Sequence, residues 1–429
     1  MLDRRRFFYS AAAATALTTL PFELAASAHD TPATALPPRA LYDRDPTAYW
    51  KAIRKLFVIP EQEVYLNNGT CGSSPTPVLK AVFDSYNDLE KMADPDPEQY
   101  PLFGYGNFDQ FREPVAKFIH CSKDELAIVR NATEANCIMA FGLDLKAGDE
   151  VLMSDQEHPS GEQPWNMRAK RHGVVVKKFK IAVPPKSPEE IIAAVEAAIT
   201  PKTKVLFVSQ ITTTTGVVVP VKELCALAKS KGIISMVDGA QVSGMMPIDV
   251  KDIGCDMYGS SPHKWLMSPK GTGFLYVRDE MIDRLWSNTT SWGWDQPNLR
   301  AGRFQQYGSA NIPVVAGMVA AIGMTNEIGL DRIEKREREL ADYLLKEMLA
   351  RGAESWTAMD PRMHCAIVTV NCPGVKRMEL ENWLWKNHHI RIRGGDPSKL
   401  RLSAPYYLQK AEIDRFLDKF DEFKKKGAA

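Results

Sequence analysis

The sequence has few of the features that mark a disulfide-bonded or zinc-binding protein. Its seven cysteines are scattered through 429 residues, their number is odd, and no two of them form a Cys-x-x-Cys pair. A disulfide framework and a structural zinc site are therefore not expected. We expect most of the cysteines to be buried and to pack as small hydrophobic side chains.

Long runs of one charge sign and long apolar runs are also missing. There are 54 Lys and Arg against 53 Asp and Glu, so the formal net charge is +1, and no basic run is long enough to follow a nucleic-acid backbone. No apolar run reaches the roughly 20 residues that cross a bilayer. The sequence therefore predicts neither a nucleic-acid partner nor a stable membrane span.

The first 28 residues have the features of an export signal. Arg4-Arg5-Arg6 precedes two Phe residues and an apolar stretch over 9–20, and Ala26-Ser27-Ala28 has the small-x-small form of a cleavage site. This combination is typical of a secretory signal, and its basic part resembles a twin-arginine signal. We expect residues 1–28 to engage the twin-arginine export machinery, which carries folded proteins, and the mature protein to be periplasmic. The alternative is an uncleaved helix with a chance arginine cluster.

The rest of the chain follows the pattern of a soluble α/β protein. Residues 29–60 are expected to form an N-terminal arm, of which the Pro/Ala-rich part 29–48 reads as extended, and strand-like apolar runs then alternate with helix-like stretches. This alternation predicts a mostly parallel sheet flanked by helices. The predicted strands of this sheet are 126–129, 150–154, 174–179, 205–208, 233–237, 257–260 and 273–277. We expect a large α/β domain at 61–315 and a smaller C-terminal α+β domain at 316–429.

A lysine lies in a tight loop after the predicted strand 257–260, within Ser260-Ser261-Pro262-His263-Lys264-Trp265. Partial burial would lower the pKa of the Lys264 amine to about 7–8 and make it a nucleophile that forms a Schiff base with an aldehyde. Ser261 and His263 would donate hydrogen bonds to a phosphate. Taken alone, a His-Lys pair is more often part of an exposed loop.

The predicted strand 233–237 leads directly into Asp238-Gly239-Ala240-Gln241. An Asp in this place is most often a helix cap or turn residue. The functional alternative is a carboxylate that keeps a pyridine nitrogen protonated, so that the ring acts as an electron sink. Gln241 would then contact the phenolic oxygen of the same ring.

Two further loops follow predicted strands. The segment 131–136 opens a helix, whose first free N–H groups, at Ala132 and Thr133, form an anion site or simply a capped helix start. His158 follows the strand 150–154, where its imidazole either stacks on an aromatic ring or is an ordinary polar loop residue.

Together, these motifs resemble the class V aminotransferases, a family that includes cysteine desulfurases and isopenicillin N epimerases. The resemblance runs from about Tyr65 to Tyr407 and is most specific around Asp238-Gly239-Ala240-Gln241 and Ser261-Pro262-His263-Lys264-Trp265. The segments 65–72 and 157–160 look closest to the isopenicillin N epimerase-like branch. The resemblance implies the fold type I of enzymes that use pyridoxal 5'-phosphate (PLP).

The resemblance also implies a role for each matching residue. Lys264 would carry the cofactor, Asp238 would pair its ring nitrogen, and His158 would stack on the ring. The other implied cofactor contacts are Gln241 at the phenolic oxygen, Thr212 near the ring, and Ala132, Thr133, Ser261 and His263 at the phosphate. Arg401 would grip the substrate carboxylate, with Asn68 near the substrate.

Family members are dimers in which a Gly-Thr-x-Asn segment reaches the partner's phosphate site. Here the segment reads Gly308-Ser309-Ala310-Asn311, so the resemblance implies a homodimer with shared active sites and a phosphate contact from Ser309. Cysteine desulfurases carry a nucleophilic Cys on the loop before the carboxylate-binding Arg, whereas the stretch 393–398 has none. This departure argues against persulfide-forming desulfurase activity.

The sequence leaves the reaction open. The expected substrate is a small molecule or peptide with an amino group next to a carboxylate, and Lys264 would remove the Cα proton after the amino group has displaced it from the cofactor. Transamination is our first expectation because it needs only Lys264 as proton shuttle. The alternatives are an epimerase or a C–S/β-lyase, for instance in periplasmic maturation of a pyoverdine-type siderophore, and a catalytically inactive binding protein of the same fold.

Overall fold

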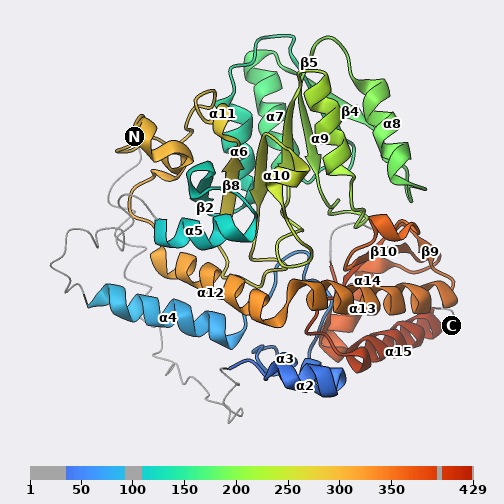
Figure 1. Ribbon diagram of the computed structural model, residues 1–429. Helices are drawn as coiled ribbons and strands as arrows, with labels where there is room; N and C mark the ends of the chain where they lie inside the picture. Colours follow the sequence, from blue (N-terminus) through green and yellow to red (C-terminus); the bar gives the residue numbers. More distant parts are fainter. Residues whose placement is uncertain (1–34, 92–108, 394–398, 428–429) are drawn as a thin grey trace, which may run out of the picture. The chain divides into compact units, whose positions relative to one another are not determined.

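The computed structural model of the protein describes residues 35–91, 109–393 and 399–427 (Figure 1). The predicted signal at 1–28 and residues 29–34 of the predicted arm lie outside the described residues. So do positions 394–398 of the loop in which a desulfurase would carry its cysteine.

A seven-stranded sheet forms the centre of the larger part of the chain. Its strands, in the spatial order β2-β8-β7-β6-β5-β3-β4, are β2 (Leu126–Val129), β8 (Gly273–Val277), β7 (Met257–Ser260), β6 (Ile234–Asp238), β5 (Thr203–Ser209), β3 (Glu150–Ser154) and β4 (Val175–Phe179). Within this sheet only β8 runs antiparallel to its neighbours. The prediction of a mostly parallel sheet is confirmed, and each predicted strand lies within two residues of its observed bounds.

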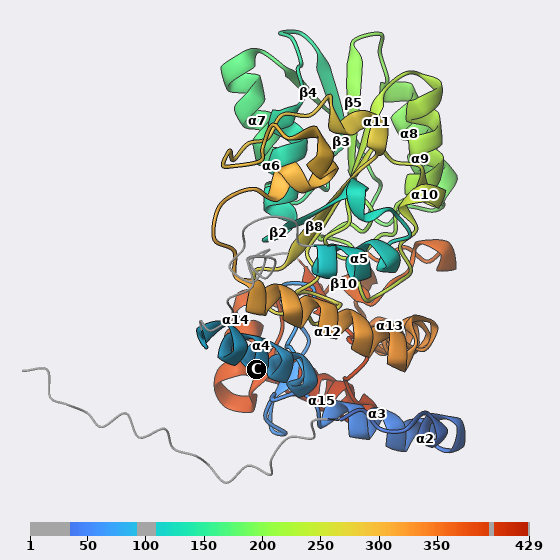
Figure 2. The ribbon, with the colours of Figure 1, turned by 60° about the vertical axis from the view of Figure 1, so that its left-hand side comes forward.

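Helices cover both faces of this sheet because alternate strand residues point to opposite sides. Leu152 and Leu206 join the core cluster that contains residues of two helices, α8 (Pro188–Ala198) and α9 (Val221–Ser230). Their neighbours Met153 and Phe207 join the cluster on the other face, with α6 (Ala132–Gly142) and α7 (Pro159–His172). Figures 1 and 2 show the two helix pairs on opposite sides of the strands. The sheet and the helices on its two faces therefore form three layers, and the sheet has apolar residues on both faces.

The C-terminal part has its own small sheets and core. An antiparallel sheet has the order β12-β10-β9, and a two-stranded parallel sheet joins β1 to β11. The strands are β1 (Val64–Tyr65), β9 (Glu354–Ser355), β10 (Ile367–Asn371), β11 (Ile390–Arg391) and β12 (Leu400–Ser403), and the helices are α13 (Leu330–Ala350), α14 (Arg377–His388) and α15 (Lys410–Gly427). Val64 and Leu66 belong to this C-terminal core although they lie early in the chain. Because residues 33–429 form one compact unit, the predicted domain boundary at 315/316 stays a prediction.

Two helices run between these parts. The apolar helix α12 (Ile312–Ile328) packs against α4 (Thr76–Glu90), and a Cβ at Gly317 would come within 2.5 Å of Val82 and Pro269. The remaining helices of the larger part are α5 (Asp109–Phe118), α10 (Val250–Ile253) and α11 (Asp279–Ile282). No single helix in the described ranges is long and apolar enough to cross a bilayer; α12 and α13 pass that test only when joined, and they meet at a bend of 80°.

The prediction of an extended arm is wrong for much of its described part. Residues 39–54 form the helices α2 (Arg39–Arg44) and α3 (Pro46–Arg54). The side chain of Asp45 caps α3, and Pro46 occupies its first turn, where its missing N–H costs no hydrogen bond. Trp50 packs against Tyr406 in the core. Tertiary packing of these aromatic residues explains why the Pro-rich composition was misleading.

The sheet places the predicted functional loops together. The strands β2, β3, β5, β6 and β7 all end at the same edge, which is the carboxyl edge where ligands bind in open α/β sheets. Asp238 is the last residue of β6, and the segments that follow the other four strands contain Ala132, His158, Thr213 and Lys264.

Candidate active site

A cavity of about 230 Å³ lies at this carboxyl edge. The sequence-predicted residues that line it are Ala132, Thr133, His158, Ser261, His263 and Lys264. Its other lining side chains include Thr70, Thr213 and Arg393, which the sequence analysis did not assign to the site. Six residues from three separate motifs are thus brought together as predicted.

One end of the cavity has the donors that an anion needs. Asn131 caps α6 by accepting from Glu134 N at 3.0 Å, and the first helical N–H, at Ala132, meets the Ser261 hydroxyl at 2.8 Å. The Nδ1 of His263 lies 3.2 Å from the Thr272 carbonyl. Because a carbonyl only accepts, Nδ1 carries the proton in this bond. A helix start and hydroxyl groups therefore converge as in a phosphate site, beside the His263 ring, whose Nδ1–H already donates to Thr272.

Lys264 lines the cavity and is half-buried. Burial lowers the pKa of its amine to about 8, and the cations Arg401 and Arg393 lower it further against the opposing charge of Asp238. The predicted fall towards neutrality is confirmed. A fraction of this amine is consequently uncharged and nucleophilic near pH 7 to 8.

Asp238 is the last residue of β6 and is 3% exposed. One carboxylate oxygen accepts from the Asn136 amide at 2.8 Å, and the other accepts from Ala240 N at 2.9 Å. Asn136 is buried on α6, and its own carbonyl oxygen has no hydrogen-bond partner in the described structure. The sequence analysis did not assign Asn136 to the site, because nothing in a helical Asn indicates which strand end it faces.

His158 is held as the N-cap of α7. Its Nδ1 accepts from Ser160 N at 3.1 Å, so the proton of the neutral ring is on Nε2. Burial, and then the nearby Lys264, lower the pKa of His158 and keep the ring neutral. The preceding residue, Glu157, is buried and accepts from Ser209 N at 3.1 Å and Ser209 Oγ at 2.5 Å, which fixes the loop to β5.

At the other end of the site, Arg401 of β12 is 3% exposed. Its Nη1 donates to the Thr213 carbonyl at 3.0 Å and to Thr213 Oγ1 at 2.9 Å, and its Nη2 donates to Thr70 Oγ1 at 2.8 Å. Burial, followed by the repulsion from Arg393, lowers the pKa of Arg401 to about 9. Its Nε has no partner, and no ion pair to it is found among the described residues. Such a buried cation is suited to bind an anion from outside the chain.

Two predicted positions are corrected. Thr212 is fully buried away from the cavity: its hydroxyl contacts Thr215 and accepts from Val217 N at 3.0 Å, and Thr213 takes the cavity-lining place instead. Asn68 is also fully buried, and its amide donates to the Lys264 carbonyl at 3.1 Å. It therefore braces the lysine loop rather than lining the cavity. Both errors are shifts of one or two positions within a loop, which alignment to a motif does not resolve.

Of the remaining predicted cofactor contacts, Gln241 is buried and Ser309 is exposed. Gln241 is 2% exposed, and its amide donates to the Gly69 carbonyl at 2.9 Å and accepts from the Trp265 indole at 2.7 Å. Ser309 is exposed, before α12, and does not line the cavity of this chain. Its phosphate contact to a partner stays a prediction.

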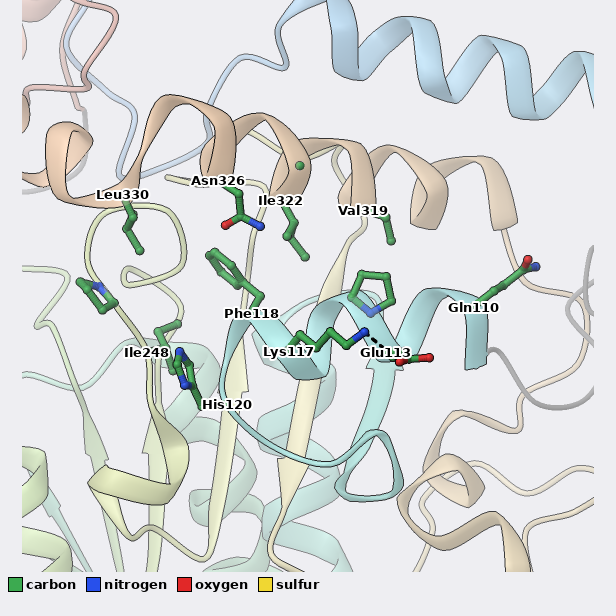
Figure 3. Close-up of a pocket in the computed structure, with 13 residues that line it drawn as sticks. Gln110, Glu113, Lys117, Phe118, His120, Ile248, Val319, Ile322, Asn326 and Leu330 are labelled. Carbon is green, nitrogen blue, oxygen red and sulfur yellow. Dashed lines mark ion pairs between the residues drawn. The ribbon is translucent and has the colours of Figure 1, made fainter. Parts of the chain in front are cut away.

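A larger cavity, of about 600 Å³, lies between α5 and α12 (Figure 3). Its lysine, Lys117, is exposed and pairs with Glu113 at 2.9 Å. A solvated, paired amine keeps its charge and is a poor nucleophile. The smaller cavity around Lys264 is therefore the better candidate for chemistry.

The chain is similar to known proteins along most of its length. Residues 64–416 match the family described as aminotransferase class-V. The chain is 30% identical to isopenicillin N epimerase of Streptomyces clavuligerus, over 87% of this chain and 98% of the relative. It is 30% identical to a probable cysteine desulfurase of Halalkalibacterium halodurans, over 75% and 82% of the two chains.

Among solved structures, the apo structure of cysteine desulfurase from Thermococcus onnurineus NA1 superposes with a TM-score of 0.79 at 25% identity, covering 87% of this chain and 98% of the other. The seven-stranded, mostly parallel sheet flanked by helices is thus the fold type I of PLP-dependent enzymes. The family match covers most of the chain, and the chain belongs to the class-V aminotransferase family.

Proposed function

We propose that the protein is a PLP-dependent enzyme that removes the Cα proton of an amino acid or an amino-terminal peptide residue, with transamination as the outcome. The observation that carries this proposal is a cavity-lining lysine with a lowered pKa that interacts electrostatically with a buried carboxylate, Asp238, and a buried guanidinium, Arg401. Among the described residues Arg401 has no acidic partner.

The residues present fit the cofactor. Ala132 N–H, Thr133, Ser261 and His263 would hold its phosphate, His158 would face its ring, and Asp238 would hold the proton of its ring nitrogen. The cofactor, when bound, supplies an aldehyde for amines and an electron sink for the carbanion at Cα. Gln241 contributes an amide N–H group rather than a charge.

The chain's own groups then divide the work. Arg401 binds the substrate carboxylate through its planar guanidinium and so orients the Cα–H bond. Lys264, whose pKa of about 8 lies near working pH, takes this proton and returns it to another atom. Lys264 suits this role better than His158, whose Nδ1 lone pair already accepts from Ser160 N.

Epimerisation is the second candidate. The similarity to isopenicillin N epimerase over nearly the whole of both chains favours it. It requires a proton donor on the opposite face of the substrate in addition to Lys264, whereas transamination needs Lys264 alone as proton shuttle. A lyase outcome of the desulfurase kind needs a nucleophilic cysteine, and the stretch 393–398 contains none.

The experiment that tests the proposal is absorbance spectroscopy of the protein loaded with PLP, followed by borohydride reduction and peptide mass spectrometry. We expect a near-visible band and a reduced cofactor adduct on Lys264. The Lys264→Ala variant loses both, whereas the control variant Lys270→Ala, which changes an exposed lysine of the same loop, keeps both. An adduct on another lysine, or an unchanged band in Lys264→Ala, rules out the assignment.

The reaction outcome is tested by incubation with amino acids in heavy water. A keto acid product supports transamination. Deuterium at Cα with inverted configuration and no keto acid supports epimerisation instead. Release of a β-substituent as sulfur supports the lyase alternative.

We also propose a homodimer with shared sites, supported by the exposed Ser309 beside Asn311, which caps α12 and accepts from Tyr86 Oη at 3.0 Å. Mixing inactive Lys264→Ala with inactive Ser309→Trp should restore part of the activity, because one of the two mixed sites then contains only native residues. If each active site is built from a single subunit, mixing the two variants restores no activity.

Export by the twin-arginine route, to the periplasm, is proposed from the arginine cluster at Arg4 to Arg6 and the site after Ala28. Cell fractionation and N-terminal sequencing should find a mature chain beginning at His29. Replacing Arg4 and Arg5 by Lys should leave the precursor in the cytoplasm, and a periplasmic variant would contradict this route.

A further inference from the structure

Resting on the proposed function, we propose that Trp265 and Thr213 are positioning residues that lock the Gln241 amide and connect it to the Arg401 guanidinium. The group that faces the cofactor and the group that grips the substrate would then be held by one hydrogen-bonded chain. None of the motif assignments gives a role to either Trp265 or Thr213.

The first link fixes which end of the Gln241 amide faces which neighbour. The indole Nε1 of Trp265, which only donates, lies 2.7 Å from Gln241 Oε1. The carbonyl of Gly69, which only accepts, lies 2.9 Å from Gln241 Nε2. A flipped amide would lose both bonds at once. Because Trp265 is fully buried, no water replaces its N–H as the donor.

The second link is the hydroxyl of Thr213. Its Oγ1 accepts from Gln241 Nε2 at 3.3 Å and from Arg401 Nη1 at 2.9 Å. A hydroxyl oxygen that accepts two hydrogen bonds has its own O–H left as a donor. Thr213 lines the cavity, so this proton is available to a bound anion.

The chain of bonds joins segments that are distant in sequence. Trp265 follows β7, Gln241 follows β6, Thr213 follows β5, and Arg401 belongs to β12 of the C-terminal sheet. Arg401 keeps a second hold on Thr213 through the main-chain carbonyl, at 3.0 Å. Loss of the hydroxyl alone should therefore loosen Arg401 without releasing it.

The first test measures the link without using activity. In the purified full chain, the Trp265 indole N–H is assigned by ¹⁵N NMR from its loss in Trp265→Phe, and its exchange with solvent is compared with that of the exposed Trp292. We expect slow exchange for Trp265 and a changed Trp265 resonance in Thr213→Val. Exchange as fast as that of Trp292, or a resonance unmoved by Thr213→Val, overturns the link whether or not the proposed function holds.

The second test asks what the link does. In Thr213→Val we expect KM for the amino substrate to rise about tenfold with a smaller fall in kcat, since one bond to a charged group is lost. In Trp265→Phe the Gln241 amide is free to flip, so that its oxygen as well as its N–H group can face the cofactor. We therefore expect the pH midpoint of the cofactor absorbance to move by about 0.7 pH unit. Thr213→Ser keeps the hydroxyl and should keep KM and kcat at the wild-type values.

The matched control is Thr212→Val, the same chemical change one position earlier. Thr212 bonds to Thr215 and Val217 N outside the cavity, so its loss should lower stability without moving KM or the absorbance midpoint. Equal effects of Thr212→Val and Thr213→Val on KM would show that Thr213 has only a structural role. Absence of the band in the wild type, with Trp265 exchange still slow, would instead reject the proposed function alone.

Discussion

The two ends of the Lys264 cavity are assembled in different ways. The cofactor end comes from loops that follow strands of one sheet, such as Ala132 after β2 and Ser261 after β7, the two strands that flank β8. The substrate end needs the meeting of Arg401, on a separate three-stranded sheet, with Thr70 and with Thr213. The first end is a property of the large sheet, and the second depends on how two sheets pack.

This difference divides the expected effects of mutations. A change at the cofactor end should act on cofactor binding and on the chemical step. A change at the substrate end should act on KM with the cofactor band kept. The predictions below either break this division or sharpen it.

The largest effect is expected for Asp238→Asn. The charge that holds the ring nitrogen proton is lost while the shape remains, so kcat should fall about 100-fold or more. The cofactor absorbance should shift with it. Asp256→Asn is the control, since Asp256 is also a buried Asp but lies at the start of β7 and pairs with Arg278. Retained kcat in Asp238→Asn would show that this carboxylate has a structural role.

Arg401→Lys should raise KM by about 10- to 100-fold, because a single ammonium does not replace the planar guanidinium and its fixed bonds. The absorbance of the cofactor on Lys264 should keep its intensity. Steady-state kinetics and a spectral titration check the two parts separately. Loss of the cofactor in this variant would mean that Arg401 also controls cofactor binding.

The same division explains what the sequence predicted well. The alternation of apolar strands and helices located all seven strands of the large sheet, and the residues just after β2, β6 and β7 met at one edge as parallel topology requires. The local signals at Lys264, Ser261 and Ala132 were weak taken singly, and their order along the chain, which resembles that of the family, selected them; all three line the same cavity.

The substrate end was predicted less well, for physical reasons. Whether Thr212 or Thr213 faces the cavity depends on the conformation of one turn. The position of Asn68 depends on how its loop packs on the lysine loop, where its amide donates to the Lys264 carbonyl. The contact of Asn136 with Asp238 joins a helix to a strand end about a hundred residues later. No periodicity in the sequence carries such information.

Asn136→Leu should reduce cofactor affinity or kcat by about tenfold, the effect of one hydrogen bond to a charged group. The removed donor is the amide that holds Asp238 at 2.8 Å. Asn136→Asp should be worse, because it brings a second carboxylate to the same place. Titration of the apoprotein with PLP compares the two. Equal affinity in Asn136→Leu and wild type would show that Ala240 N–H is enough to orient Asp238.

The smallest effect is a shift in the titration of Lys264, which lies between the two ends. In the cofactor-free protein its pKa of about 8 is below the value of about 10.4 in the unfolded chain. Between these pH values the unfolded chain binds more protons at this position, so the free energy of unfolding should rise with pH. Chemical denaturation at pH 8 and pH 10 should show a larger rise for wild type than for Lys264→Met.

The two ends should move this titration in opposite directions. Asp238 raises the pKa of Lys264 and Arg401 lowers it, so Asp238→Asn should lower it further and Arg401→Gln should bring it back towards its ordinary value. The pH dependence of amine labelling at Lys264, followed by mass spectrometry, measures both shifts. Shifts of the same sign would mean that burial alone sets the pKa of the Lys264 amine, and that neither end of the cavity acts on this pKa through charge.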